Sequence, residues 1–129
     1  MNSFKRNTIL FSLQSLRYRD DEILDMACEG IMKDKSITAK TLTSSLYLLA
    51  KFKYKPDESF LKKSCEVLKN ELVLPVDLAC RNLWNFYSLD YYDPKLFDMF
   101  SEIIVKNHEK VSEIDVANAL SSFLHFKHS

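Results

Sequence analysis

The chain has 129 residues, with 18 basic and 18 acidic side chains and therefore no formal net charge. Its length suits one domain with a modest core, and its neutrality argues against strong nonspecific affinity for nucleic acids. One glycine and three prolines are too few for the tight turns of a sheet protein, so the composition favours helices joined by short loops. No apolar run reaches the roughly 18–20 residues of a membrane span, and we expect no membrane contact.

One apolar pattern recurs along the chain at steps of 36 or 37 residues. Its four copies are Leu10, Leu13, Leu16 and Tyr18; Leu46, Leu49, Phe52 and Tyr54; Leu83, Phe86, Leu89 and Tyr91; and Leu120, Phe123, Phe126 and His128. The i, i+3 spacing within each copy is typical of the apolar stripe of a helix. A period of this length predicts a stack of helical repeats.

The predicted fold is all-α: an α-α superhelix, or solenoid, of about three and a half two-helix repeats. The repeats span 4–37, 38–74, 75–111 and the partial 112–129. We expect first helices at 4–18, 39–53, 76–90 and from 113 onward, and second helices at 21–33, 57–71 and 94–108. Thr38, Asp93 followed by Pro94, and Ser112 are the kinds of residue that begin helices. Because one hairpin buries too little apolar surface to fold alone, neighbouring repeats must stack.

The two ends of the chain pose separate questions. Residues 1–19 carry Lys5, Arg6, Arg17 and Arg19 without an acid, which resembles an organellar transit peptide. The same residues hold the first copy of the repeat in register, and this alignment favours a structural helix. The fourth repeat has no second helix to cover its apolar residues. The chain is therefore expected to be part of a longer protein, or to bind a partner at that surface.

Polar side chains beside the apolar stripe form the candidate binding surface of the first helices. These helices and their flanks hold ten basic and four acidic residues, which leaves an equal excess of acid on the second helices. Stacked first helices would then present a basic face suited to phosphate, although a merely solvated face is the simpler alternative. The candidate RNA-binding residues are Ser44, Lys51, Lys55, Arg81, Asn85, Ser88 and Asn118.

Other chemistry has little support in the sequence. Three widely spaced cysteines without a CxxC motif argue against disulfides and zinc, and fit a reducing compartment. His125 and His128 lack a third metal ligand, so no metal site is predicted. Trp84 aligns with Tyr47 and Phe11, which favours packing between repeats over ligand stacking. Because no phosphate loop, nucleophile elbow, HExxH motif or catalytic carboxylate pair is present, we expect neither an enzyme nor a cofactor.

Two segments carry a resemblance to a known family. These are residues 82–97, NLWNFYSLDYYDPKLF, and residues 45–54, SLYLLAKFKY. They resemble the helical repeats of organellar RAP-domain proteins, which include the FASTK-like proteins and the octotricopeptide repeat proteins. The repeats of that family carry a similar L-W-A-x-A-K-L-x-Y-x-D-x-x-L-F pattern. The resemblance covers the repeat region, and it implies a mitochondrial solenoid acting in RNA processing, stability or translation. A cytoplasmic location is the alternative.

Two functional hypotheses follow. The first is a non-catalytic helical-repeat segment that binds single-stranded organellar RNA through the ridge of its first helices. The second is a protein scaffold, or a subunit of a mitochondrial ribosome or other assembly, which would bind its partner through the last helix. The residues expected at that partner surface are Leu120, Phe123 and Phe126.

Overall fold

A computed structural model describes residues 3–15 and 20–128 of the chain. Within these ranges the chain forms α-helices and one short 3-10 helix, with no strand, which confirms the predicted all-α class. The helices are α1 (Ser3–Ser15), α2 (Asp21–Lys33), α3 (Ala39–Lys51), α4 (Glu58–Lys69), α5 (Val76–Leu89), α6 (Pro94–Lys106), η1 (His108–Lys110) and α7 (Glu113–His125). Each expected helix is present, and the ends that fall within the described residues differ by up to two residues. The residues expected to end the first helix, 16–18, lie outside the described ranges.

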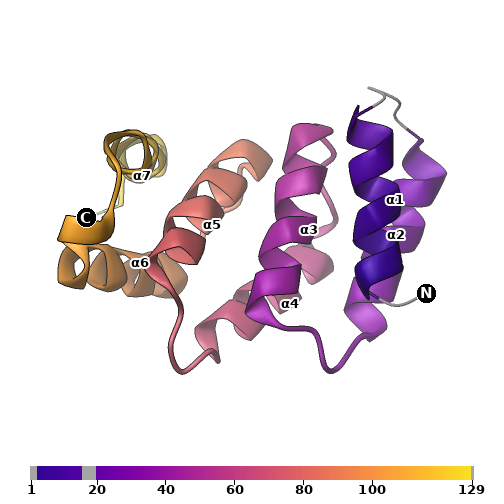
Figure 1. Ribbon diagram of the computed structural model, residues 1–129, viewed down its shortest axis with the longest axis horizontal. Coiled ribbons are helices and arrows are strands. Elements are labelled where there is room, and N and C mark those ends of the chain that lie inside the picture. Colours follow the sequence, from indigo (N-terminus) through magenta and orange to yellow (C-terminus); the bar gives the residue numbers. More distant parts are fainter. Residues whose placement is uncertain (1–2, 16–19, 129) are drawn as a thin grey trace.

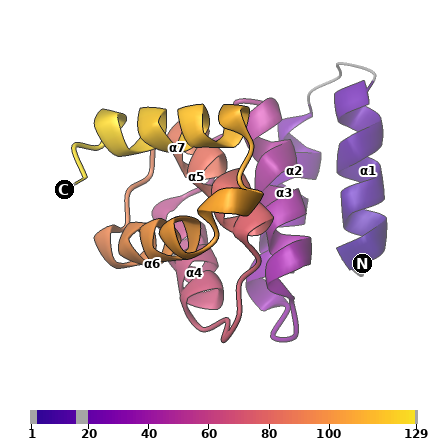
Figure 2. The same cartoon turned by 60° about the vertical axis from the view of Figure 1, so that its left-hand side comes forward.

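The helices form two layers. Figure 1 shows α1, α3, α5 and α7 following one another along the molecule, with α1 and α7 at opposite ends. Helix α3 packs against both α1 and α5, and α5 also packs against α7. In the second layer, α4 packs against α2 and α6, and Figure 2 shows these helices on one side of the first layer. Helices that are neighbours in each layer therefore come from consecutive repeats.

The apolar stripe lies at the centre of this packing. Leu10, Leu46 and Leu83, which share one repeat position, have no exposed surface. The second helices contribute Phe60, Phe97 and further apolar residues to the same core. Leu120 occupies the same position in α7 but is 55% exposed, and within the described residues α7 is the last helix of the row. The last copy of the stripe is thus only partly covered.

The first helices contact one another in a parallel register. The hydroxyl of Ser45 donates a hydrogen bond to the side-chain oxygen of Asn7 (2.7 Å), and that of Ser122 donates to the carbonyl of Leu83 (2.9 Å). The amide of Asn82 donates to the hydroxyl of Thr43 at 2.9 Å. These partners are 38 or 39 residues apart, close to the repeat step. Equivalent turns of successive helices therefore lie side by side.

Three first helices end in the same way. Lys53, Asp90 and Lys127 have positive φ angles of 54–55° and lie 37 residues apart. The next residue of each donates its backbone N–H five residues back: Tyr54 to Leu49, Tyr91 to Phe86 and His128 to Phe123. This is the Schellman helix ending, formed here without glycine. This ending explains why an aromatic ring or histidine fills the fourth position of the repeat pattern. The residue at that position (Tyr54, Tyr91 or His128) follows the left-handed residue, and its ring folds back onto the apolar stripe.

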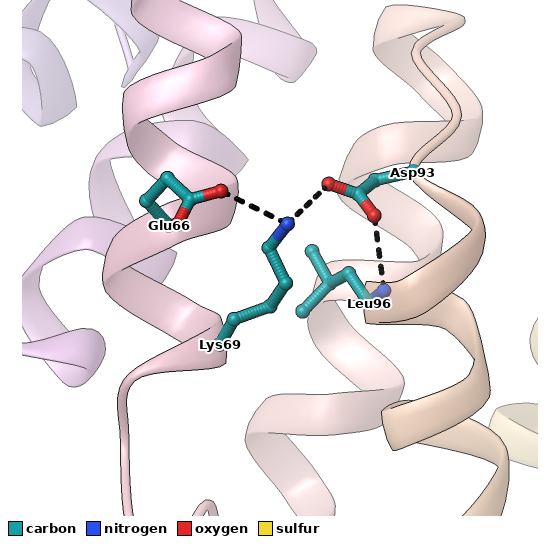
Figure 3. A network of polar contacts seen from close by, with 4 residues as sticks. All are labelled: Glu66, Lys69, Asp93 and Leu96. Carbon is teal, nitrogen blue, oxygen red and sulfur yellow. Dashed lines mark hydrogen bonds and ion pairs between the residues drawn. The ribbon is translucent and has the colours of Figure 1, made fainter.

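A charged group joins two helices of the second layer. The ammonium of Lys69 lies 3.0 Å from carboxylate oxygens of both Glu66 and Asp93, and Figure 3 shows it between α4 and the start of α6. Asp93 also accepts a hydrogen bond from the backbone N–H of Leu96 (3.1 Å), so it caps α6 as expected. Burial alone would raise the pKa of the Asp93 carboxyl. The Leu96 N–H and the Lys69 ammonium outweigh burial and hold that pKa below its usual value.

Candidate nucleic-acid interface

Two aromatic rings from consecutive repeats meet on the surface of the first layer. Tyr47 of α3 and Trp84 of α5 have ring centroids 5.5 Å apart, inclined at 44°. Each ring is half-buried, so part of its face remains accessible. The ammonium of Lys51 lies 5.4 Å from both ring centroids, and the guanidinium of Arg81 lies 4.5 Å from that of Tyr47. Two cations and two rings thus form one cluster across the α3–α5 boundary.

This cluster separates two pockets, which we call together the Tyr47–Trp84 groove. One pocket of about 540 Å³ is lined by Ala50, Lys51, Lys53, Lys55, Trp84, Ser88, Leu89 and Asp90. The other, of about 310 Å³, is lined by Tyr47, Lys51, Cys80, Arg81, Trp84, Ile114, Asp115 and Asn118. Lys51 and Trp84 belong to both pockets. The two pockets together therefore border α3, α5 and α7.

Cations outnumber acids along the groove, with Lys51, Lys53, Lys55 and Arg81 against Asp90 and Asp115. Asp90 is engaged by the imidazole of His125 at 2.9 Å, and this hydrogen bond lowers the pKa of the Asp90 carboxyl. Among the described residues no ion pair involves the four cations, although the Lys55 ammonium donates to the carbonyl of Asp90 (3.0 Å). Their charge is therefore available to a ligand.

Most of the predicted RNA-binding residues do meet in this groove. Five of the seven line it: Lys51, Lys55, Arg81, Ser88 and Asn118. Ser44 is exposed on α3 but lines neither pocket.

Asn85 is a correction to the sequence analysis. Its side chain has no exposed surface, and its amide donates to the backbone carbonyl of Thr43 and to the side-chain oxygen of Asn82, both at 3.2 Å. A ligand on the groove cannot reach it. The equivalent residues Leu48 and Ser122 are also buried, so this position of the first helices contacts the preceding repeat. The accessible face of the first helices therefore includes the position of Trp84 and not that of Asn85.

The expected partner surface on α7 also needs correction. Phe123 and Phe126 are half-buried, and both pack edge-to-face against Phe97 of α6, with ring centroids 6.2 and 5.4 Å away. Helix α6 of the preceding repeat therefore covers the two phenylalanines. Of the predicted three, Leu120 is exposed, and it is joined on the outer side by residues that the sequence analysis did not select: Ile114, Val116 and Leu124.

A further pocket, of about 410 Å³, lies between α2 and α4 and has a different chemistry. Its lining includes Asp25, Cys28, Glu29, Tyr54 and Asp57. The Tyr54 hydroxyl donates a hydrogen bond to the carboxylate of Asp25. Burial is the largest cause that raises the pKa of Tyr54, and this hydrogen bond is the next. The described residues contain no group of three or more His, Cys, Asp or Glu side chains that could hold a metal ion.

The three cysteines are free and buried. Burial raises the thiol pKa to about 12 for Cys28 and Cys65 and to about 11 for Cys80, so none is a reactive thiolate at neutral pH. None of the described helices is long and apolar enough to cross a bilayer.

Sequence reasoning did not select Tyr47 and Trp84 as groove residues, since it favoured packing between repeats over ligand stacking for Trp84. The ring contact confirms the packing role, yet the same two rings form the wall shared with the basic side chains. Two signals could have found them. Aromatic residues fill one repeat position in three copies, and Lys51 follows Tyr47 by one helical turn.

Searches of protein-family models, of curated proteins and of solved structures find no match to this chain. The family resemblance therefore rests on the repeat motif in the sequence.

Proposed function

We propose that the chain is a non-catalytic helical-repeat segment that binds single-stranded RNA along the Tyr47–Trp84 groove. The observation that carries this proposal is the pair of aromatic rings with Lys51 and Arg81 beside them. Sites for single strands combine aromatic faces, on which bases stack, with basic side chains that follow the backbone. Both elements are present here on one surface, while the net charge of the whole chain is zero.

In this proposal each side chain has a distinct role. Trp84 and Tyr47 would stack on one or two bases, because both rings are half-exposed; Trp84 borders both pockets and Tyr47 borders the smaller one. Lys51, Lys53, Lys55 and Arg81 would contact phosphates, and Ser88 and Asn118 would hydrogen-bond to sugars or base edges. The resemblance to the RAP-domain family extends the proposal to mitochondrial RNA and to its processing, stability or translation.

The test uses the only tryptophan of the chain, Trp84. A base that stacks on this ring should quench its fluorescence, so titration with single-stranded RNA reports on the groove itself. Anisotropy of a labelled RNA across a salt series gives the affinity and the number of phosphates contacted, because each contact contributes about 0.7 to the slope of log K against log salt. We expect Lys51→Glu and Arg81→Glu to weaken binding and to lower this slope.

A matched control comes from the second layer. Lys106→Glu on α6 makes the same charge change at an exposed lysine away from the groove, and should alter affinity little. Trp84→Ala should weaken binding roughly 5- to 150-fold, which corresponds to about 1–3 kcal/mol per stacked base. The proposal is wrong if RNA does not bind at low salt, or if Lys106→Glu weakens binding as much as Lys51→Glu does. Far-UV circular dichroism of each variant checks that the fold is retained.

A protein scaffold is the second candidate, and the exposed apolar side chains of α7 favour it. It predicts that substitutions on the outer side of α7 abolish assembly while groove substitutions leave it intact. Pull-down with Leu124→Asp and with Lys51→Glu as bait separates the two functions, since the first variant should lose a protein partner and the second should lose RNA.

A further inference from the structure

The smaller pocket of the groove carries a pair of polar side chains on one face of α7. Asp115 and Asn118 are three residues apart, so their side chains are neighbours on the surface of the helix. Both residues are half-buried, and both line the pocket of about 310 Å³ together with Tyr47 and Trp84. A carboxylate and a carboxamide therefore lie side by side next to the aromatic wall of the groove.

The fold uses backbone groups of these two residues but leaves their side chains without a partner. The backbone N–H of Asp115 donates to the hydroxyl of Ser112, and the carbonyl of Asn118 accepts from the hydroxyl of Ser122. Within the part of the chain that the structure describes, no hydrogen bond or ion pair involves the Asp115 carboxylate or the Asn118 side-chain amide. After burial, the charge of Asp115 is the next cause that raises the pKa of the Cys80 thiol, which belongs to the lining of the same pocket. The carboxylate and the amide are therefore available to a ligand in the pocket.

This pair of groups is complementary to one of the four RNA bases. The Watson–Crick edge of guanine presents the acceptor O6 followed by two adjacent donors, N1–H and the N2 amino group. A carboxylate can accept from two adjacent donors, and the NH2 of a carboxamide can donate to the acceptor beside them. Adenine, cytosine and uracil lack a second adjacent donor, so each can make at most two of these three hydrogen bonds.

We propose that the smaller pocket selects guanine when single-stranded RNA lies in the Tyr47–Trp84 groove. This inference rests on the proposed function and adds a base preference to it. The guanine stacks on the aromatic wall with its Watson–Crick edge toward α7. Asp115 accepts from N1–H and from the N2 amino group, while Asn118 donates to O6. A carboxylate in a basic groove repels phosphate, so recognition of a base gives this acid a role that the cations beside it do not have.

The test compares short RNAs that differ at one position. Oligouridine is the reference, and its central uridine is replaced in turn by guanosine, inosine or adenosine. By fluorescence anisotropy, the guanosine RNA should bind about 5- to 150-fold more tightly than oligouridine, as expected for one good bidentate contact to a base edge. Inosine lacks the N2 amino group and should lose most of this gain. Adenosine controls for the stronger stacking of a purine and should not reproduce the gain.

Two acids in the first turn of α7 provide matched variants. Asp115→Asn removes the double acceptor, so it should abolish the preference for guanosine and make oligouridine bind more tightly, because a negative charge leaves the groove. Glu113→Gln removes the same charge from the same turn, at an exposed residue that does not line the pocket. It should leave the preference for guanosine unchanged. A role of Asp115 limited to the start of the helix would instead weaken the binding of all the RNAs equally.

The outcomes separate this inference from the proposed function. If none of the RNAs binds at low salt, the proposed function is wrong and the guanine preference is wrong with it. If all of them bind with equal affinity, RNA binding stands and the guanine preference alone is wrong. The preference is also overturned if inosine or adenosine binds as tightly as guanosine, or if folded Asp115→Asn retains it. Circular dichroism checks the fold of each variant, and the comparison of the RNAs needs no variant at all.

Discussion

Asp93 stabilises the fold in two ways that substitution can separate. It caps α6 by accepting a hydrogen bond from Leu96, and it forms an ion pair with Lys69, whose side chain is 24% exposed while that of Asp93 is 19% exposed. Loss of the cap should cost about 1 kcal/mol. The partly buried ion pair should contribute about 1 kcal/mol more, at the upper end of values for surface pairs. We therefore expect Asp93→Ala to lower the free energy of unfolding by about 2 kcal/mol.

Two further variants separate these contributions. Asp93→Asn keeps a good capping acceptor but removes the charge, and should cost about 1 kcal/mol. Asp57→Ala removes the equivalent cap of α4, which bonds to the N–H of Phe60 at 2.9 Å and takes part in no ion pair among the described residues. It should also cost about 1 kcal/mol. Urea denaturation followed by far-UV circular dichroism measures all three. If Asp93→Ala costs no more than Asp57→Ala, the ion pair adds nothing and the reasoning fails.

The pH dependence checks the same ion pair. The pKa of Asp93 is lower in the folded protein than in the unfolded chain, so its stabilisation is complete above the unfolded-state value of about 3.9. It is lost as the pH falls through the folded-state pKa. The difference in stability between the wild-type protein and Asp93→Asn should therefore shrink below about pH 4. A difference that persists unchanged in strong acid would show that charge is not its cause.

Three further outcomes follow from burial. The native thiols should react with a thiol reagent only slowly at neutral pH and rapidly in urea, because burial raises their pKa values to about 12, 12 and 11 for Cys28, Cys65 and Cys80. Asn82→Ala should lower the free energy of unfolding by roughly 1–3 kcal/mol, since it removes a buried hydrogen-bonded amide. Phe97→Ala should lower it by about 3–5 kcal/mol, because this ring has no exposed surface, and chemical denaturation measures both.

The repeat pattern predicted the helices well because each copy combines an apolar stripe with start signals. Thr38, Asp93 and Ser112 do cap their helices as expected. The binding ridge was less predictable. Periodicity identifies the residues that share a helix face, but the side that faces the preceding repeat depends on how the helices are rotated about their own axes. Asn85 was misassigned for this reason, as its polar amide satisfies a backbone carbonyl inside the stack.

The surface of α7 was only partly predictable for a related reason. Equivalent positions suggested that Phe123 and Phe126 were uncovered, whereas Phe97 of the preceding second helix reaches both rings. The second helix of a repeat therefore packs against the first helix of its own repeat and against that of the next. Stripe spacing alone cannot show this sharing, because it depends on the stagger between the two layers.

Lys53, the left-handed residue just after α3, affects fold stability and ligand affinity in opposite directions. A lysine with φ of 55° bears a steric strain that glycine would avoid, so Lys53→Gly should make the protein more stable by roughly 0.5–1 kcal/mol. The same ammonium borders the larger pocket of the groove, and its removal should weaken any polyanion held there. Selection for thermal tolerance alone would favour glycine at this turn, whereas selection for a phosphate-bearing ligand would keep the strained cation.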